Sequence, residues 1–317
     1  MLVREVLNTA RMKETAVAVE SSLESARLEQ FRTRLAGPLA VVGSGGSFTT
    51  AALWAYLHES AGYPAWAMTP YAFAESRLPA GTRVLLLSAG GNHHDIIRTA
   101  DLALRRGCET LAMTCRPESA LATRVARGSS IDAVLVVPEP VHADGLIAVH
   151  GLVAFAVLAA RIYAGPGPWA SCFDVDASPM PEVPPRFVVA FGGGAAAPAA
   201  IDFANKCQEA GIAPAWQTDV RHFAHGQWMM LHLAGADMLL VAFATRSQRE
   251  YLERFAAALP ASIPQRRIDV DDEGAPAALS LLARAMRSFD VLASRGHGAP
   301  TLETIPAWCR DLYELEP

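Results

Sequence analysis

The sequence predicts an α/β protein built from two similar units, each a small doubly wound domain whose parallel sheet is covered by helices on both faces. Two observations lead to this prediction. A short apolar strand that ends in a glycine turn occurs twice, at residues 38–43 and 186–192. An Ala-Gly pair and then a tryptophan follow each turn at nearly the same distance, at Trp66 and Trp216. One strand-turn-helix-strand unit used twice explains this agreement.

Each unit continues with another apolar strand, over residues 84–87 and 238–241, followed by a polar turn and an arginine-rich amphipathic helix. Segments dense in proline and glycine lie between the two units and indicate a linker. We therefore expect four parts along the chain. They are an N-terminal helical segment at 1–36, a first domain at 37–165, a linker at 166–185, and a second domain with a C-terminal tail at 186–317.

The composition excludes several classes of partner. The 317 residues are 51% hydrophobic with a formal net charge of −5, and they lack the basic face that nucleic-acid binding requires. The N-terminus has no apolar segment typical of a secretory signal. The apolar stretch 146–160 is interrupted by His150 and Gly151, and it is shorter than the ~20 residues that a membrane-spanning helix needs. We expect a cytoplasmic protein with no nucleic-acid and no membrane partner.

Two glycine-containing loops of the first unit are candidate ligand sites, because ligands of open parallel sheets bind at the carboxyl ends of the strands. Residues 43–47 (Gly-Ser-Gly-Gly-Ser) open a helix, whose backbone N–H groups attract an anion. Residues 88–92 (Ser-Ala-Gly-Gly-Asn) precede another helix, with Asn92 as the expected N-cap. A tight turn would also explain the first loop, and capping alone would explain Asn92. The adjacent glycines of the second loop favour contact with an anion.

The second unit carries a glycine-rich loop of its own. Residues 192–197 (Gly-Gly-Gly-Ala-Ala-Ala) match the dinucleotide-binding pattern G-x-G-x-x-A, and Asp219 is the nearest acidic residue for a ribose. Phe48 replaces the third glycine in the first unit. A lone match of this kind is weak, so we expect no cofactor and keep a dinucleotide-dependent enzyme as an alternative.

Two side chains suited to proton transfer occur in the second unit only. Glu209 stands just before the Ala-Gly pair, where the first unit has Ser60, and His225 follows the second-unit tryptophan. A carboxylate and an imidazole are the groups best suited to acid-base chemistry near neutral pH. A solvated helix residue and an ordinary turn histidine would explain the same two positions.

Metal binding has weaker support in the sequence. Asp219, His222 and His225 lie close together in the chain, but no helix and no established ligand spacing supports a metal site there. The five cysteines form no Cys-x-x-C pair, which argues against a zinc knuckle and a disulfide framework. We expect no metal.

These residues together resemble the sugar isomerase (SIS) domain family, in which two such domains run in tandem, as in the isomerase half of glucosamine-6-phosphate synthase. The resemblance covers roughly residues 37–245 and is sharpest in the loops 43–47 and 88–92. Residues 204–209 (Ala-Asn-Lys-Cys-Gln-Glu) resemble the family's A-L-K-x-K-E helix, and residues 223–226 (Phe-Ala-His-Gly) resemble its L-K-H-G-P turn. The family fold is a flavodoxin-like or Rossmann-like three-layer sandwich.

The resemblance also implies roles for individual residues. Glu209 would move a proton between C1 and C2 of a sugar through an enediol. His225 would assist ring opening, reaching across a dimer interface, and Lys206 falls on the family's lysine as a third catalytic residue. The implied phosphate-binding residues are Gly45, Gly46, Ser47, Ser88, Gly90, Gly91, Asn92 and His93.

Departures from the family pattern limit what the resemblance implies. In the family's phosphate loop S-x-S-G-x-T, Gly90 replaces the second serine and His93 the threonine, so two hydroxyl donors are missing. A protonated His93 or His94 could bind the same anion. We expect a homodimer that binds a sugar phosphate or related carbohydrate derivative and catalyses aldose-ketose isomerisation, deglycation or deamination. A non-catalytic sugar-phosphate sensor is the alternative.

Overall fold

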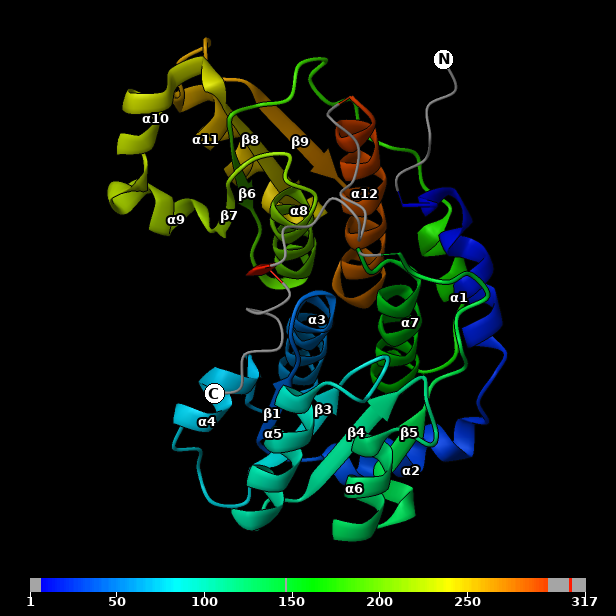
Figure 1. Cartoon of the computed structure of the whole chain (residues 1–317). Helices are drawn as coiled ribbons and strands as arrows, with labels where there is room; N and C mark the ends of the chain where they lie inside the picture. The colour runs from blue at the N-terminus through cyan, green and yellow to red at the C-terminus, as the bar shows by residue number, and fades with distance from the viewer. Residues whose placement is uncertain (1–6, 146, 296–307, 310–317) are drawn as a thin grey trace. The chain divides into compact units, whose positions relative to one another are not determined.

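The computed structural model describes residues 7–145, 147–295, 308 and 309. These residues divide into two compact units (Figure 1). The N-terminal unit contains residues 14–144, 150–170, 308 and 309, and the C-terminal unit contains residues 7–13, 145, 147–149 and 171–295. Residues 1–6 of the predicted helical segment and most of the predicted tail after residue 295 lie outside the described residues. The predicted domain boundaries stay a prediction.

The N-terminal unit is built on a parallel sheet with the strand order β2-β1-β3-β4-β5. The central strands β1 and β3 are buried except for Arg83 at the start of β3, as expected when helices cover both faces of a parallel sheet. Their register pairs Val42 with Leu86 near the carboxyl ends. The strands are β1 (Leu39–Val42), β2 (Ala65–Met68), β3 (Arg83–Leu87), β4 (Thr110–Thr114) and β5 (Val134–Val136).

Helices cover the two faces of this sheet in an order set by its connections. Helix α3 connects β1 to β2, and α5 connects β3 to β4 in the opposite direction across the sheet. Because both connections are right-handed crossovers, α3 and α5 lie on opposite faces of the sheet. Side-chain packing agrees, since Trp54 of α3 packs against Tyr163 of α7 while Phe73 of α4 shares a core with Ile96 of α5. The helices are α1 (Met12–Glu20), which crosses the unit boundary, α2 (Ser25–Leu35), α3 (Gly46–Ser60), α4 (Pro70–Glu75), α5 (His94–Arg105), α6 (Ala120–Gly128) and α7 (His150–Ala164).

The C-terminal unit has a second parallel sheet, with the strand order β7-β6-β8-β9. Its strands are β6 (Phe187–Phe191), β7 (Ala215–Thr218), β8 (Met238–Ala244) and β9 (Gln265–Asp269). Its helices are α8 (Ala197–Glu209), α9 (Val220–His222), α10 (Met229–Ala234), α11 (Arg249–Ala258) and α12 (Gly274–Ser294), with a π-helical turn η5 (Phe223–Gln227) between α9 and α10.

Aromatic contacts show which helices cover each face of the second sheet. Phe203 of α8 packs edge-on against Phe243 of β8 and Phe289 of α12. Phe191 of β6 packs instead against Phe223 of η5, in a separate core. Helices α8 and α12 therefore cover one face, and the α9-η5-α10 segment covers the other.

The predicted α/β class, the parallel sheets and the N-terminal helices are confirmed. The strand order β2-β1-β3-β4 corresponds position by position to β7-β6-β8-β9. That correspondence fits a duplicated unit, although the duplication itself stays a prediction. No helix in the described part of the chain combines the length and apolar character needed to cross a membrane.

Candidate functional site

The two predicted anion loops follow neighbouring strands of the N-terminal sheet. Residues 43–45 follow β1 and residues 88–93 follow β3, and these two strands are hydrogen-bonded side by side. The helices that begin after them, α3 and α5, leave toward opposite faces. This is the topological switch point, where open α/β sheets bind their ligands. The structure thus brings the two predicted loops to the same edge of one sheet.

The first loop has the backbone of a tight turn and also opens a long helix. Gly45 has φ 54°, in the left-handed region, and is the N-cap of α3. A Cβ at Gly43 would lie 2.6 Å from the backbone oxygen of Ser47. At the start of α3 the amide of Ser47 donates to the carbonyl oxygen of Ser44 at 3.0 Å and that of Phe48 to Gly45 at 2.9 Å, which leaves the amide of Gly46 without an acceptor among the described residues. Glycine is therefore needed here for shape, and the same shape leaves the Gly46 N–H group for an anion.

The two glycines of the second loop differ in their surroundings. Gly91 is buried with φ 64°, and a Cβ there would lie 2.5 Å from Oγ of Ser119. Gly90 is exposed, and a Cβ there would meet nothing within 4 Å. The amide of Gly91 donates to Oγ of Ser88 at 3.1 Å. Gly91 and Ser88 therefore shape the loop, and Gly90 is the position where a ligand can approach the backbone.

Asn92 does not cap the helix that follows it, which corrects the sequence-based expectation. Its Oδ1 accepts a hydrogen bond at 2.9 Å from the amide of Ala120, in the first turn of α6. His93 is the N-cap of α5 instead, with Nδ1 accepting from the amide of Asp95 at 3.3 Å. The loop is thereby tied to α6 through a residue far away in the chain, which local patterns cannot show.

A further acidic residue that the sequence analysis missed lies beside this loop. Asp144 accepts hydrogen bonds from the amides of His150 at 2.6 Å and Gly151 at 2.8 Å, at the start of α7. A Cβ at Gly151 would lie 3.6 Å from that of Ala89. Because the Asp144 carboxylate already accepts from these two amides, they are not available to a ligand anion.

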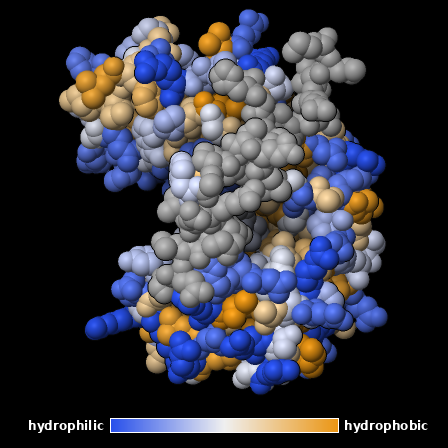
Figure 2. All heavy atoms as spheres, viewed as in Figure 1, coloured by the Kyte–Doolittle hydropathy of each residue, from blue (hydrophilic) through white to orange (hydrophobic). Residues whose placement is uncertain are grey.

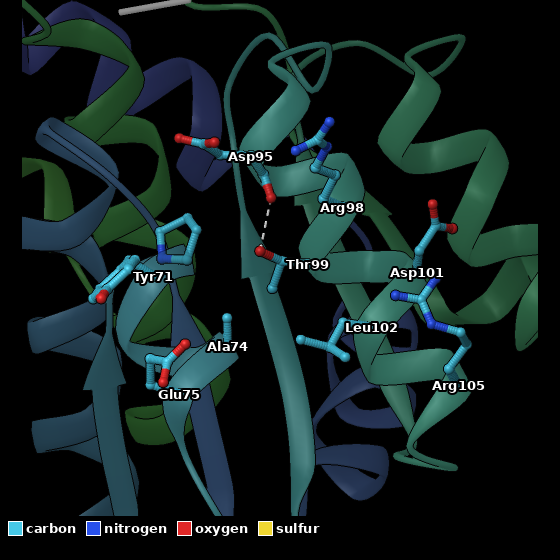
Figure 3. A pocket seen from close by; sticks show the side chains of 10 residues that line it. Tyr71, Ala74, Glu75, Asp95, Arg98, Thr99, Asp101, Leu102 and Arg105 are labelled. Atoms are coloured by element: carbon cyan, nitrogen blue, oxygen red, sulfur yellow. Dashed lines mark hydrogen bonds between the residues drawn. The ribbon is translucent and has the colours of Figure 1, made fainter. Parts of the chain in front are cut away.

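A pocket of about 810 Å³ lies between α4 and α5 in the N-terminal unit (Figure 3). Tyr71 and Glu75 of α4 stand across from residues of α5. The α5 residues recur every three or four positions and so share one helix face; this spacing was the available sequence signal. The lining residues are Pro70, Tyr71, Ala74, Glu75, Asp95, Arg98, Thr99, Asp101, Leu102 and Arg105.

In the C-terminal unit, Lys206 lies inside the core. Its Nζ is 2.5 Å from Oδ1 of Asp202, one turn earlier in α8, and the two side chains are only 2% and 1% exposed. This burial explains why a lysine is tolerated among apolar residues, since a buried charge needs a partner. The ion pair gives Lys206 a structural role, and its predicted catalytic role gains no support.

Glu209 and His225 occupy opposite faces of one sheet. Glu209 ends α8, on the face covered by α8 and α12. It also lies near the amino ends of the strands, because α8 runs back from the end of β6 toward the start of β7. His225 is exposed in η5 on the other face, after the carboxyl end of β7. One C-terminal unit therefore does not bring these two predicted catalytic groups together.

The environments of the two groups also differ. Glu209 is exposed, yet surrounding protein removes enough water to raise the pKa of its carboxyl above the ordinary value, while Lys206 lowers this pKa and Asp202 raises it. His225 lies in a distorted turn whose next residue, Gly226, has φ 137°. Its Nε2 lies 3.5 Å from an Arg221 guanidinium nitrogen. A raised carboxyl pKa is a property that general bases and acids share.

A small pocket of about 130 Å³ lies at the Gly192 loop, lined by that glycine, Asp219 and Arg221 among others. Asp219 accepts hydrogen bonds from the amides of Arg221 and His222 and so caps α9. Ligand pockets typically measure roughly 300–1,000 Å³, so this one is small for a dinucleotide. Gly192 itself is needed for close packing, because a Cβ there would lie 2.4 Å from the backbone oxygen of Ala196. The alternative of a dinucleotide cofactor gains no support.

Comparison with solved structures shows the fold class. Tagatose-6-phosphate ketose/aldose isomerase from Escherichia coli matches with a TM-score of 0.72 at 18% identity, covering 94% of this chain and 96% of the other. Glucosamine-6-phosphate deaminase from Thermotoga maritima matches with a TM-score of 0.65 at 16% identity, over 90% and 93%.

The C-terminal domain of glucosamine-fructose-6-phosphate aminotransferase from Francisella tularensis gives a TM-score of 0.65 at 13% identity, over 94% and 96%. No protein-family model matches the sequence, and a search of curated proteins finds no significant match. The chain therefore shares the mixed α/β fold with parallel sheets of these solved structures.

Proposed function

We propose that the chain binds a sugar phosphate or related carbohydrate derivative, with the phosphate held at the switch point of the N-terminal sheet. The observation that carries the proposal is the meeting of the two glycine loops after β1 and β3. The amide of Gly46 at the start of α3 and the hydroxyls of Ser47 and Ser88 would contact the phosphate oxygens. Exposed Gly90 would allow the loop backbone to approach them.

We propose further that bound sugar undergoes isomerisation, deglycation or deamination by proton transfer through an enediol. Glu209 is the proposed base, because its raised carboxyl pKa suits proton transfer nearer neutral pH. His225 is the proposed ring-opening group. Lys206 is left out of the proposed machinery because it is buried in an ion pair.

The opposite placement of Glu209 and His225 supports a homodimer in which a second copy supplies one of them. The segment around His225 has the character of an interface, since Trp228, Met229 and Leu233 are exposed to 48%, 46% and 74%. Figure 2 shows hydrophobic side chains gathered over α10 on the visible face. The oligomeric state follows directly from sedimentation of the wild type and of a Leu233→Glu variant, which we expect to be monomeric.

A non-catalytic sensor is the second candidate, favoured by the same two observations: Lys206 is sequestered, and Glu209 and His225 lie apart within one unit. A screen of sugar phosphates by thermal shift finds ligands for either protein, since any ligand of the native state raises Tm. Turnover then separates the candidates. An isomerase or deaminase incorporates solvent deuterium at C2 of the stabilising sugar and loses this exchange in Glu209→Gln, whereas a sensor shows no exchange in the wild type.

A further inference from the structure

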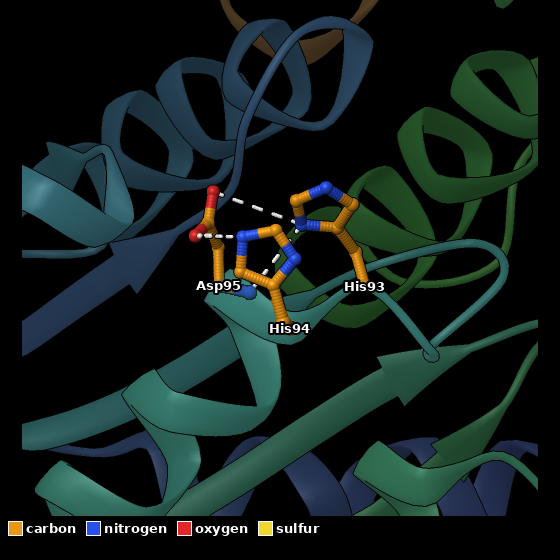
Figure 4. Close-up of side chains that lie close together, drawn as sticks. All are labelled: His93, His94 and Asp95. Carbon is orange, nitrogen blue, oxygen red and sulfur yellow. Dashed lines mark hydrogen bonds and ion pairs between the residues drawn. The ribbon is translucent and has the colours of Figure 1, made fainter. Parts of the chain in front are cut away.

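Three consecutive side chains, those of His93, His94 and Asp95, converge at the start of α5 (Figure 4). Nε2 of His94 lies 3.1 Å from one oxygen of the Asp95 carboxylate, and Nδ1 of His93 lies 3.7 Å from the other. The two imidazole rings are themselves close, with centroids 4.2 Å apart. One ligand atom from each residue lies within 4.8 Å of the other two.

The two separations that involve Asp95 are close to the spacing of ligands around a small metal ion. Metal-to-ligand distances of about 2.0–2.2 Å and tetrahedral angles place ligand atoms about 3.3–3.6 Å apart. The two measured distances lie on either side of this range, and an ion bound at Nδ1 of His93 would replace the hydrogen bond that this atom accepts from the Asp95 amide at 3.3 Å. All three side chains are between 19% and 31% exposed. An ion can therefore enter from solvent while the helix start holds the ligands in place.

The ligand types select the class of ion. Two imidazole nitrogens and one carboxylate oxygen suit zinc and neighbouring first-row divalent ions, whereas calcium and magnesium prefer oxygen ligands only. Three protein ligands leave a fourth position open for water or for an oxygen of a bound molecule, which is the pattern of catalytic and ligand-binding zinc sites.

The residues around the cluster indicate what the open coordination position could bind. Asp95 also lines the pocket of about 810 Å³ between α4 and α5, together with Arg98 and Arg105. Without an ion, the Asp95 carboxylate places a negative charge beside the loop where we propose that phosphate binds. A divalent ion shared by two neutral imidazoles and one carboxylate would make this position positive. It would also take the place of the hydroxyl donors that Gly90 and His93 remove from the phosphate loop.

We propose that His93, His94 and Asp95 form a binding site for a first-row divalent transition-metal ion, best matched by Zn²⁺, whose open coordination position binds an anionic oxygen of the ligand. The ion site rests on the geometry of these three residues alone. The contact with a ligand anion rests in addition on the proposed function.

The test of the ion site uses the full-length protein after chelator treatment and dialysis. Zn²⁺ binding is measured by calorimetry, and Co²⁺ reports the coordination geometry through its visible absorption. We expect one equivalent per chain. His94→Gln and Asp95→Asn should each weaken binding at least about tenfold, since even outer-shell changes cost about 10–100-fold in affinity. His93→Asn should do the same while it keeps a side-chain acceptor for the N-cap of α5.

Matched controls are His232→Gln, which alters an exposed histidine of α10, and Asp101→Asn, which alters another acidic residue of α5. Both should bind Zn²⁺ as the wild type does. Circular dichroism checks that each variant is folded. Absence of stoichiometric binding to the wild type, or equal binding by the folded His94 and Asp95 variants, would overturn the ion site.

The anion contact is tested by adding inorganic phosphate to the Co²⁺-loaded protein. We expect a change in the Co²⁺ absorption in the wild type, and a loaded protein whose absorption does not respond would overturn the contact while leaving the ion site. The proposed function is tested separately, by sugar-phosphate stabilisation of the chelator-treated protein and its loss in Ser47→Ala. If no sugar phosphate stabilises the protein while Zn²⁺ still binds, the proposed function is wrong and the ion site stands.

Discussion

Lys206 and Asp202 form a buried ion pair within one helix, with Nζ and Oδ1 2.5 Å apart and both side chains at most 2% exposed. The lysine that the family resemblance assigned to catalysis is thus held in the core of the C-terminal unit. Removing one member of such a pair leaves a buried charge without its partner, which typically costs about 3–5 kcal/mol.

We therefore predict that Lys206→Met lowers the free energy of unfolding by about 3–5 kcal/mol. The double variant Asp202→Leu/Lys206→Met should recover most of this loss, because two apolar side chains of similar size remove both charges together. Chemical denaturation of the two variants measures the difference. A Lys206→Met protein as stable as the wild type but without turnover would instead restore the catalytic interpretation.

Gly90 and Gly91 should respond differently to the same substitution. Gly91→Ala requires a left-handed backbone at an L-residue and places a Cβ 2.5 Å from Oγ of Ser119, so we expect it to lower stability by more than about 1 kcal/mol. Gly90→Ala meets open space and should leave the Tm unchanged. If the loop binds phosphate, Gly90→Ala will weaken the Tm increase caused by sugar phosphates. A Gly91→Ala protein of wild-type stability would contradict the loop geometry described above.

These two glycines also show how far sequence reasoning reaches. The alternation of strands and helices predicted the parallel sheets, and the position of each loop after a strand predicted its place at the carboxyl edge. Which glycine shapes the loop depends on Ser119, which is distant in the chain, as is the Ala120 amide that Asn92 caps. Such contacts depend on tertiary packing and have no local signal.

The candidate catalytic residues show the same limit. Asp202 and Lys206 are four residues apart, so their contact on one helix face could be predicted from the sequence. The burial of both side chains could not be predicted in this way. Glu209 and His225 lie on opposite faces of the sheet because of the direction in which α8 crosses from β6 to β7. Predicting that direction requires the strand order, which the sequence alone does not give. The cluster of His93, His94 and Asp95 was not predicted as a metal site, because three consecutive ligands match no familiar metal-binding spacing.

His58 should make the N-terminal unit sensitive to acid. Its Nε2 lies 2.7 Å from the carbonyl oxygen of Gly37 and its Nδ1 2.7 Å from the hydroxyl of Tyr163. Burial lowers the pKa of His58; the hydrogen bond to Gly37 opposes this change, and the charge of Arg83 adds to it. Because the folded-state pKa lies below the unfolded value, the unfolded chain binds a proton more readily, and stability is lost as pH falls below about 6.5.

We expect His58→Gln to flatten this part of the pH dependence, since glutamine does not titrate. The measurement is the free energy of unfolding at a series of pH values between neutral and mildly acidic, for the variant and for the wild type. His232→Gln serves as the control, because this histidine is exposed and its loss should leave the profile unchanged. Parallel profiles for His58→Gln and the wild type would show that His58 does not titrate differently in the folded protein.

The pKa of Glu209 offers a test of its proposed role that does not depend on dimer geometry. Loss of surrounding water raises this pKa above 4.5, the Lys206 charge lowers it, and the Asp202 charge raises it. A base acts in its deprotonated form, so kcat/KM for the sugar phosphate found by screening should rise with pH through a midpoint above the usual carboxyl range. The double variant Asp202→Leu/Lys206→Met, which removes both charges of the buried pair, should move that midpoint to higher pH, because Lys206 lowers this pKa more than Asp202 raises it. Carboxyl carbon NMR of Glu209 follows the same titration without substrate. A kinetic midpoint that stays fixed while the NMR titration moves would assign the pH dependence to a different group.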